Sequence, residues 1–443
     1  MFKSTPLPRR RFLAQAGGVA TAALASPLFS SVSGVEGAAA TGSDRFVRKS
    51  QVLPEPRVIL PTDALPPPQG RRKRIAAITT AYFKYSHADD IITKFIEGYG
   101  VIGRTHLPHC QVVSLSIEQF PQSDIGRGMA ARYQIPLFET PAEALTLGGK
   151  ELAVDGVLLI GEHGDYPTNK KGQKLYPRRR LFEEIVKVFR RSGRSVPVFN
   201  DKHLSYSWEN ASWMYRQAGE LNFPMMAGSS VPVTWRRPPL AFRQGIGLES
   251  ALVVGSGGYF HCLELLQTFV EKRAGGECGV KAVEALEGEA AWKAAQAERW
   301  PAHLLSTAIA PVPASQKRPV NFDKLSRSVV FRVEHSDGFE AAVCMAGDVS
   351  EYCFAADVKG RSEPVSTYAY VPKPQRDHFS FLCNHIEVMF RSGQPSYPVE
   401  RTLLVTGVLD ALYDSRAAGG KRVQTPHLGD LRYTPANELI ADS

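Results

Sequence analysis

The sequence has few cysteines, and none of them forms a Cys-x-x-Cys pair. The six cysteines are spread over the chain, at Cys110, Cys262, Cys278, Cys344, Cys353 and Cys383. Iron–sulfur clusters and structural zinc sites commonly rely on closely spaced cysteines, so the sequence predicts neither. Cys344 and Cys353 lie in neighbouring strand-like segments, where a disulfide and two buried thiols are both compatible with the sequence.

Long apolar runs and nucleic-acid-binding patterns are lacking as well. Beyond residue 40 there is no run of about 18 apolar residues, so the mature chain is not expected to span a membrane. The chain carries 53 Lys and Arg against 44 Asp and Glu, and four consecutive bases at 71–74 contribute to its net charge of +9. Because no aromatic residues are interleaved with these bases, nucleic-acid binding is not expected.

The N-terminus has the pattern of a twin-arginine export signal. Arg9 and Arg10 begin an Arg-Arg-x-Phe-Leu motif, an apolar run rich in Ala and Gly extends to about Leu28, and small residues follow at 38–40. This order of basic, apolar and small-residue regions is typical of a cleaved leader. We therefore expect residues 1–40 to be a signal peptide, the twin-arginine translocase to be a partner, and the mature protein to be periplasmic or secreted.

After this leader, the sequence predicts a linker and two domains. Residues 41–72 are polar and proline-rich, and we expect them to form a linker. From 73 to 230, apolar strand-like runs alternate with helical periodicity, which predicts a Rossmann-like, doubly wound parallel sheet of the α/β class. From 231 to 443, helices mix with strand-like runs and an Asp337-Gly338 turn, which predicts an α+β domain with a mainly antiparallel sheet.

The individual elements can be placed by residue number. In the first domain, strands are expected at 75–79, 111–117, 135–138, 154–160, 196–199 and 223–227, and helices at 87–99, 126–133, 141–145, 181–191 and 205–220. In the second domain, helices are expected at 259–272, 288–297, 378–391 and 399–418, and strands at 328–335, 340–345 and 351–358. We expect these last three strands to pair with one another.

Four segments follow one another in an order that resembles a known enzyme family. They are 129–145 (MAARYQIPLFETPAEAL), 154–160 (VDGVLLI), 192–202 with its Asp-Lys ending, and 399–423 with its Gly-Lys-Arg-Val ending. These segments resemble the glucose-fructose oxidoreductase / inositol dehydrogenase family (Gfo/Idh/MocA) over nearly the whole mature chain. The resemblance implies an NAD- or NADP-dependent oxidoreductase that acts on a sugar- or polyol-like molecule and forms a homo-oligomer through its C-terminal sheet.

The chain departs from this family at the turn that would hold the cofactor. In the family, the first strand runs into a Gly-x-Gly-x-x-Gly turn, which lets a dinucleotide pyrophosphate approach the backbone. Here residues 78–87 read ITTAYFKYSH, without a glycine, so Tyr82 or Phe83 would narrow that approach. The polar residues assigned to cofactor contacts are Thr80, Ser86, Glu118 and Glu162.

The catalytic positions of the family are partly kept. Lys202 matches the lysine of the family's Glu-Lys-Pro motif, which stabilises the substrate hydroxyl or relays its proton. His261 with Glu264 resembles the family's His-x-x-Asp pair, in which the histidine is the general base. The resemblance therefore implies that Lys202, His261 and Glu264 are catalytic. From the residues alone, a helix-packing histidine and a surface lysine are equally compatible with the pattern.

The loop after the most apolar strand is peculiar to this chain. Carboxyl ends of central strands line the ligand crevice of a doubly wound sheet, so Glu162, His163 and Asp165 are expected to face it. Tyr176 and Arg178, further along the loop, are assigned as substrate contacts. Two carboxylates and an imidazole suit a divalent metal, sugar hydroxyls or an acid–base site, and a polar loop that stabilises its own turn is also compatible.

Three classes of function stay open from the sequence. They are a nicotinamide-dependent oxidoreductase, a cofactor-free or metal-assisted hydrolase, lyase or isomerase, and a non-catalytic sugar-binding protein. His106, His109 and Cys110 are also of metal-ligating type, but they precede a strand and therefore fall at the edge of the sheet opposite the crevice. No metal ligand is assigned on this basis.

Overall fold

The structure is a computed structural model that describes residues 70–101, 104–256, 258–313, 328–347, 349–373 and 376–436. The predicted signal peptide, 1–40, lies outside the described residues, as does the predicted linker up to residue 69.

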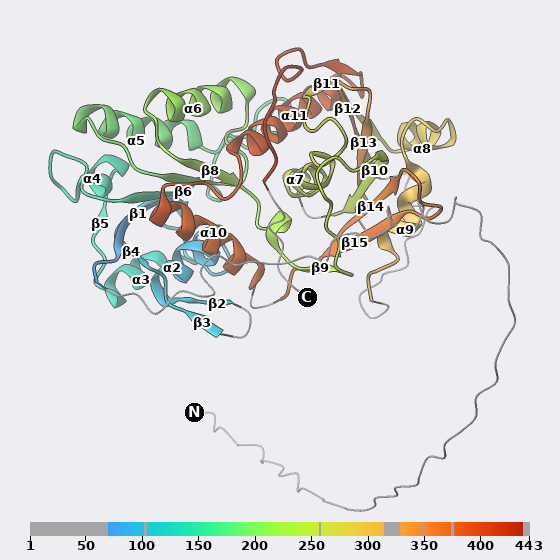
Figure 1. Cartoon of the computed structure of the whole chain (residues 1–443). Coiled ribbons are helices and arrows are strands. Elements are labelled where there is room, and N and C mark those ends of the chain that lie inside the picture. The colour runs from blue at the N-terminus through green and yellow to red at the C-terminus, as the bar shows by residue number, and fades with distance from the viewer. Residues whose placement is uncertain are drawn as a thin grey trace, which may run out of the picture. The chain divides into compact units, whose positions relative to one another are not determined.

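The first part of the described chain forms a six-stranded parallel sheet (Figure 1). Its strands are β1 (Lys73–Ala81), β4 (Cys110–Gln119), β5 (Leu137–Phe138), β6 (Gly156–Ile160), β7 (Val198–Asp201) and β8 (Met225–Gly228). They lie in the order β5-β4-β1-β6-β7-β8, so the winding direction reverses between β1 and β6. This is the strand order of a dinucleotide-binding fold, and the predicted Rossmann-like sheet is confirmed.

Helices cover both faces of this sheet because each strand alternates its side chains between two apolar clusters. In β1, Ala76 and Ile78 belong to one cluster, and Ile75 and Ala77 belong to the other. The first face carries α4 (Pro141–Thr146), α5 (Arg178–Ser192) and α6 (Trp208–Glu220). The second face carries η1 (Asp89–Thr93), α2 (Lys94–Glu97), α3 (Gly126–Arg132) and α10 (His378–Ser392).

The second sheet has eight strands and is mainly antiparallel, as predicted. Its strands are β9 (Arg236–Arg237), β10 (Leu248–Gly255), β11 (Val280–Glu287), β12 (Val329–His335), β13 (Glu340–Met345), β14 (Tyr352–Val358), β15 (Val365–Ala369) and β16 (Val423–Gln424). Only β10 and β13 pair in parallel among these neighbours. The expected pairing of three consecutive strands is therefore wrong in part, because β10 lies between β13 and β14.

Both faces of the second sheet are also packed by helices. One face holds α7 (Tyr259–Val270) and α11 (Val399–Ala417), and the other holds α8 (Glu289–Gln296), η3 (Ala302–Leu304) and α9 (Leu305–Ile309). The predicted Asp337-Gly338 turn joins β12 to β13, and the Asp337 carboxylate accepts a bond from the Phe339 amide at 3.1 Å. Cys344 and Cys353 are separate buried thiols, which decides between the two alternatives for this pair.

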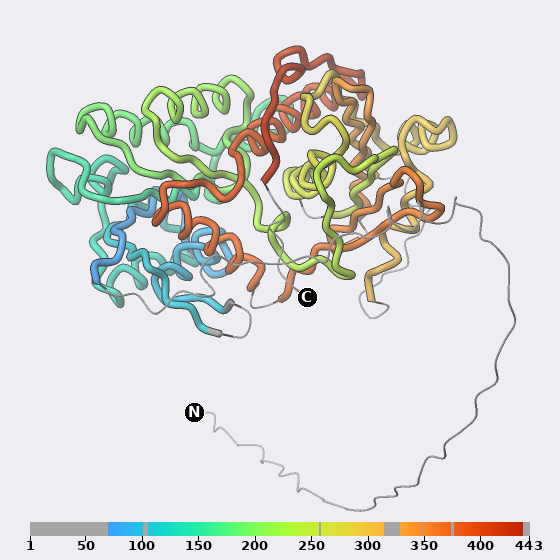
Figure 2. The backbone as a smooth tube through the Cα atoms, in the orientation of Figure 1, coloured from blue at the N-terminus to red at the C-terminus, as the bar shows by residue number. Residues whose placement is uncertain are grey.

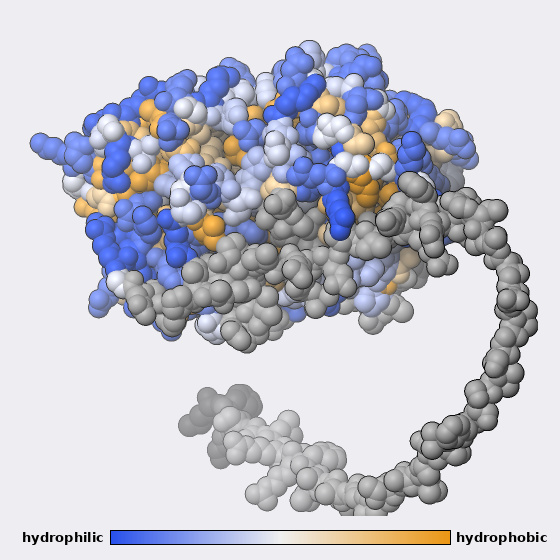
Figure 3. All heavy atoms as spheres, in the orientation of Figure 1, coloured by the Kyte–Doolittle hydropathy of each residue, from blue (hydrophilic) through white to orange (hydrophobic). Residues whose placement is uncertain are grey.

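Figure 2 shows how the chain returns from the second sheet to the first. After β15, helix α10 packs on the first sheet, and α11 then contacts both α6 and β11. The remaining elements are the β2–β3 hairpin (Tyr99–Val101 and Arg104–His106) and η2 (Val231–Val233). Hydrophilic side chains cover most of the face seen in Figure 3, with hydrophobic ones in smaller areas between them. No helix in the described ranges has both the length and the apolar character needed to cross a membrane.

Candidate active site

A cavity of about 210 Å³ lies where the carboxyl ends of β6 and β7 meet α7 and α11. Its lining comes from the loops after those strands (Glu162, Gln173, Lys174, Tyr176, Lys202, His203, Ser205, Tyr206) and from the two helices (Gly258, Tyr259, Phe260, His261, Thr406, Leu409, Asp410, Tyr413). Cavities for drug-sized ligands measure roughly 300–1,000 Å³, so this one suits a molecule of sugar size or smaller.

Lys202 occupies a strained position at the end of β7. Its φ of +60° is in the left-handed region, and its amide donates to the Gly228 carbonyl at 3.2 Å. Side chains other than glycine adopt this conformation at a cost, and such residues cluster at functional sites. The ammonium nitrogen Nζ lies 2.8 Å from Oε1 of Glu162, so this strained backbone aims the lysine at the carboxylate inside the cavity.

Glu162 is held between two cations. Its second oxygen, Oε2, is bonded to the guanidinium of Arg178, which is wholly buried. Desolvation acts to raise the pKa of Glu162, but Lys202 and Arg178 outweigh it and hold the pKa well below its usual range. Arg178 therefore orients the Glu162 carboxylate from behind, and this residue, assigned as a substrate contact, is not among those that line the cavity.

His261 lies in the first turn of α7 and lines the cavity from the second domain, as expected from the sequence. Its Nδ1 lies 2.6 Å from the Ser229 hydroxyl. Desolvation by burial, followed by the positive charge of Lys202, places the pKa of His261 well below its usual value. The imidazole is therefore neutral at neutral pH and can accept a proton. Lys202 and His261 line the same cavity, as the resemblance implied.

A chain of imidazoles extends from this cavity toward β1. The His87 ring stacks near His261, at a centroid separation of 6.2 Å, and meets His163 edge-on at 5.7 Å. Nδ1 of His87 lies 2.9 Å from Oδ1 of Asp201. Burial raises the pKa of Asp201 to about 7 and lowers the pKa of His87 well below its usual value, so the imidazole is the neutral partner in this pair. The sequence pattern did not single out His87 and Asp201, although Asp201 ends β7 and His87 lies in the segment between β1 and η1.

The turn after β1 satisfies its own backbone groups. The Ser86 hydroxyl accepts bonds from the amides of Phe83, at 3.2 Å, and of Asp89, at 3.3 Å. The Asp89 carboxylate in turn accepts the Tyr85 amide at 2.9 Å. Ser86 was assigned to the cofactor, but its hydroxyl caps this helix start instead. Tyr82 is fully buried, with its hydroxyl 2.7 Å from that of Thr93.

Two carboxylates stand where a pyrophosphate would need positive charge. Asp89 and Asp90 open η1 and are both buried. Their partners are Lys84, 3.1 Å from Asp89, and Arg376, 2.6 Å from Asp90. A helix N-terminus attracts phosphate through its free amides and its dipole. Here the carboxylates of Asp89 and Asp90 already lie at this N-terminus, so they would repel a phosphate.

The loop after β6 crosses the carboxyl end of β1. Gln119, at the end of β4, donates to the Asp165 carbonyl at 3.1 Å and accepts the Asp165 amide at 2.8 Å. Because β1 lies between β4 and β6, these two hydrogen bonds between Gln119 and Asp165 hold the loop over the end of β1. This is the site that a dinucleotide occupies in such folds. The Asp165 backbone therefore holds the loop across this crevice, and Asp165, assigned as a substrate contact, is not among the residues that line the cavity.

The other residues assigned to the cofactor serve the same closure. The Thr80 hydroxyl donates to the Glu162 carbonyl at 2.6 Å. Glu118, also assigned to the cofactor, accepts the Tyr166 hydroxyl at 2.9 Å and pairs with Arg180. These contacts, the self-capped turn and the two acids of η1 do not fit a pyridine dinucleotide.

Glu264 lies away from the cavity. Its carboxyl group bonds to the Thr402 hydroxyl at 2.7 Å beneath the end of β8, and burial raises its pKa to about 7. Glu264 therefore joins α7 to α11, and the catalytic role implied by the resemblance has no support in its position. Tyr176, assigned as a substrate contact, lines the cavity, while the His163 ring packs edge-on against Phe83 at a centroid separation of 5.1 Å.

Comparisons with known proteins give a fold but no sequence relative. No protein-family model matches the chain, and no curated protein matches it. The structure of GenD2 from gentamicin A biosynthesis, in complex with NAD, superposes on 82% of this chain and 99% of its own, with a TM-score of 0.50 and 14% identity. The fold is that of the Gfo/Idh/MocA dehydrogenases.

Two further solved structures are similar at lower scores. The apo scyllo-inositol dehydrogenase from Lactobacillus casei has a TM-score of 0.48 and 11% identity, covering 80% of this chain and 98% of its own. A probable dehydrogenase from Thermotoga maritima has a TM-score of 0.47 and 11% identity, covering 80% of this chain and 99% of its own.

Proposed function

We propose that the chain is an exported enzyme that performs acid–base chemistry on a small sugar- or polyol-like carbonyl compound, without a nicotinamide cofactor. The observation that carries this proposal is the convergence of the Lys202 ammonium and the neutral His261 imidazole on one cavity, beside a cofactor crevice that the protein closes itself. The reaction class is an isomerisation or elimination that begins with enolisation.

In this reaction His261 removes a proton from the carbon next to the substrate carbonyl. The C–H electron pair becomes the carbon–carbon double bond of an enolate, and the carbonyl oxygen takes up the negative charge. Lys202 donates one hydrogen bond to Glu162 and has further N–H donors for that oxygen. His261 then returns the proton to the former carbonyl carbon while the hydroxyl proton on the adjacent carbon passes to the enolate oxygen, so the carbonyl moves by one carbon. This completes an isomerisation that needs no external oxidant or reductant.

The rest of the cavity favours a polyhydroxylated ligand. Tyr176, Tyr259 and Tyr413 offer aromatic faces and hydroxyl groups to a sugar-sized molecule. The Asp410 carboxylate is oriented by the Trp208 amide, at 2.9 Å, and by the Gln173 side chain, at 3.0 Å. An oriented carboxylate of this kind is a strong acceptor for ligand hydroxyls.

A nicotinamide-dependent oxidoreductase is the second candidate. It is favoured by Lys202 and His261, which stand at the positions that the resemblance assigns to catalysis, and by the fold shared with NAD-bound GenD2. For a dinucleotide to bind, Gln119 would have to release the loop at Asp165, and the acids of η1 would have to be neutralised.

The two candidates are separated by proton exchange in deuterated water. The full chain is incubated with a panel of aldoses, ketoses and keto-polyols, and deuterium incorporation next to the carbonyl is followed by NMR. We expect incorporation with no added nucleotide, and a loss of about 10²–10⁴-fold in rate for Lys202→Ala and for His261→Ala. His303→Gln is the matched control, because this exposed histidine bonds Asp357 outside the cavity.

Calorimetry with NAD(H) and NADP(H) supplies the second measurement. We expect dissociation constants above about 1 mM. A dissociation constant of about 1 mM corresponds to a binding free energy of about −4 kcal/mol, so binding should be weaker than this. Micromolar, stoichiometric nucleotide binding together with nucleotide-dependent oxidation of a polyol would replace the acid–base proposal by the oxidoreductase.

A further inference from the structure

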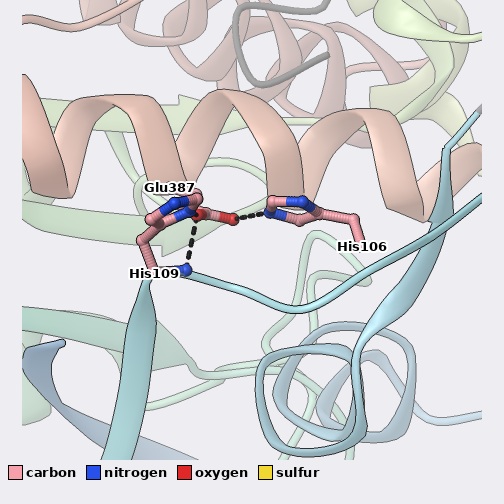
Figure 4. Close-up of side chains that lie close together, drawn as sticks. All are labelled: His106, His109 and Glu387. Carbon is pink, nitrogen blue, oxygen red and sulfur yellow. Dashed lines mark hydrogen bonds and ion pairs between the residues drawn. The ribbon is translucent and has the colours of Figure 1, made fainter. Parts of the chain in front are cut away.

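A second cluster of chemistry-bearing side chains lies on the opposite edge of the first sheet (Figure 4). His106 ends β3, His109 precedes β4, and Glu387 comes from α10, about 280 residues away along the chain. Nε2 of His106 lies 2.8 Å from Oε2 of Glu387, and Nδ1 of His109 lies 2.8 Å from Oε1. The three side chains therefore converge from a helix and from the short segment that runs from the end of β3 to the start of β4.

The Glu387 carboxylate is anchored independently of the two imidazole rings. The Tyr99 hydroxyl donates to Oε2 at 2.8 Å, and the His109 amide donates to Oε1 at 2.7 Å. Hydrogen bonds of this kind hold a metal-ligating carboxylate in a fixed orientation and are typical of the groups that surround metal ligands. The carboxylate would thus keep its place whether or not the imidazoles donate to it.

The charge balance of the cluster favours a cation. Glu387 is wholly buried, and a buried carboxylate is commonly paired with Lys or Arg. The nearby Arg72 guanidinium instead donates to the Cys110 carbonyl at 2.6 Å. Both oxygens of Glu387 are met by imidazole nitrogens, which are the usual nitrogen ligands of zinc in proteins.

We propose that His106, His109 and Glu387 bind one divalent transition-metal ion, with zinc preferred. Their three ligand atoms lie within 4.8 Å of one another, and small side-chain shifts would place them at the separation of about 3.3 Å that zinc bonds of about 2.0 Å require. Two nitrogens and one oxygen suit zinc better than magnesium or calcium, which prefer oxygen ligands.

Water supplies the fourth ligand in this site. The side chains of His106 and His109 keep 14% and 15% exposure, whereas Glu387 has none, so the open side of the cluster faces solvent. The ion would join the segment between β3 and β4 to α10. Phe379, in the first turn of α10, contacts His87 at a ring separation of 5.1 Å, so the site also braces the helix that adjoins the active-site imidazoles.

The test is a zinc titration of the full, untagged chain after removal of metals with a chelator. By calorimetry we expect one zinc ion per chain with a dissociation constant in the micromolar range or tighter. His106→Gln and His109→Gln should each weaken binding at least 100-fold. His303→Gln, which alters a histidine that bonds only one carboxylate oxygen, should leave the affinity unchanged.

X-ray absorption at the zinc edge identifies the ligands of the bound ion in the wild-type protein. This measurement does not depend on the variants, so it tests the proposal even if a variant fails to fold. We expect two imidazole nitrogens and two oxygens at about 2.0–2.2 Å. Sulfur in the coordination shell, no stoichiometric zinc in the wild type, or full affinity in either glutamine variant would overturn the proposal. Unaltered proton exchange in the metal-free protein would leave the proposed enzyme activity standing, so the two proposals fail separately.

Discussion

Replacing Glu162 by Gln tests whether the ion-pair arrangement at the cavity is as tightly coupled as its geometry indicates. Glu162 accepts from Lys202 at 2.8 Å and from the buried Arg178 guanidinium. Among the described residues, Nε and Nη1 of Arg178 have no hydrogen-bond partner, so Glu162 provides the main polar contact of this cation. Glutamine has the same size and keeps one acceptor oxygen, so the change removes charge with little change in volume.

The expected loss in the free energy of unfolding is about 3 kcal/mol. Removing one partner of a buried ion pair destabilises proteins by about 3–5 kcal/mol, because the other charge is left uncompensated. The glutamine oxygen can still accept a bond from Arg178, which places the expected value at the lower end of that range. The cation–π contact of Arg178 with Tyr176, at 5.3 Å, is unaffected by the change.

Urea denaturation followed by circular dichroism measures this loss. Glu289→Gln is the matched control, because Glu289 forms an i,i+4 pair with Lys293 at 2.8 Å while both side chains are 71–76% exposed. An exposed pair of this kind contributes little, so the denaturation midpoint of the control should not move. A loss below about 1 kcal/mol in Glu162→Gln would refute the inference that Arg178 depends on this carboxylate.

The same pair predicts a pH dependence with a definite sign. The pKa of Glu162 is lower in the folded protein than its ordinary value of 4.5, mainly because Lys202 and Arg178 outweigh desolvation. The unfolded chain therefore binds the proton more readily, and stability is lost as the pH falls below about 4.5. Between pH 5 and pH 3 the wild type should lose more stability than Glu162→Gln, and equal slopes would contradict the assigned pKa direction.

Two further predictions concern the leader and the packing beneath β8. Arg9→Lys combined with Arg10→Lys should keep the protein in the cytoplasm in cell fractions, because the twin-arginine route depends on these residues; normal export of this variant would remove the argument for the route. Gly228→Ala should destabilise by more than about 1 kcal/mol, because Gly228 has a φ of +127° and an added Cβ would lie 2.9 Å from Glu264 Oε2. Gly360→Ala, at φ +81° with open space around it, measures the backbone strain alone, and an equal loss in both variants would exclude a packing effect at Gly228.

Much of the fold was predictable because burial leaves a clear pattern in the sequence. The strands of the first sheet are short apolar runs separated by amphipathic helices, and the structure places each of them close to its predicted range. The second sheet was predicted less well. β10, β11 and β15 were not assigned, because an apolar run alone does not separate a buried strand from a buried helix. The insertion of β10 between β13 and β14 depends on contacts that no local pattern records.

In the candidate site, too, some residues could be predicted from the sequence and others could not. Lys202 and His261 were predictable because both stand at element ends that the sheet topology brings to one crevice. His87 and Asp201 are 114 positions apart in the sequence, and Gln119 and Asp165 are 46 positions apart. Hydrogen bonds between residues so far apart leave no local pattern in the sequence. Glu387 was missed for a similar reason, since its partners come from a loop far away along the chain.

One loop both crosses the carboxyl end of β1 and orients Lys202. The carbonyl of Glu162 is held by Thr80, its carboxylate fixes Lys202, and two bonds from Gln119 hold Asp165 three residues later. A rearrangement that opened the crevice for a dinucleotide would therefore move the residue that positions the Lys202 ammonium. Introducing glycines at Tyr82 and Phe83 would leave this clamp in place, so the glycine-free turn accompanies the closure and does not by itself cause it. The course of the loop across the carboxyl end of β1 and the position of the Lys202 ammonium in the cavity thus depend on the same set of contacts.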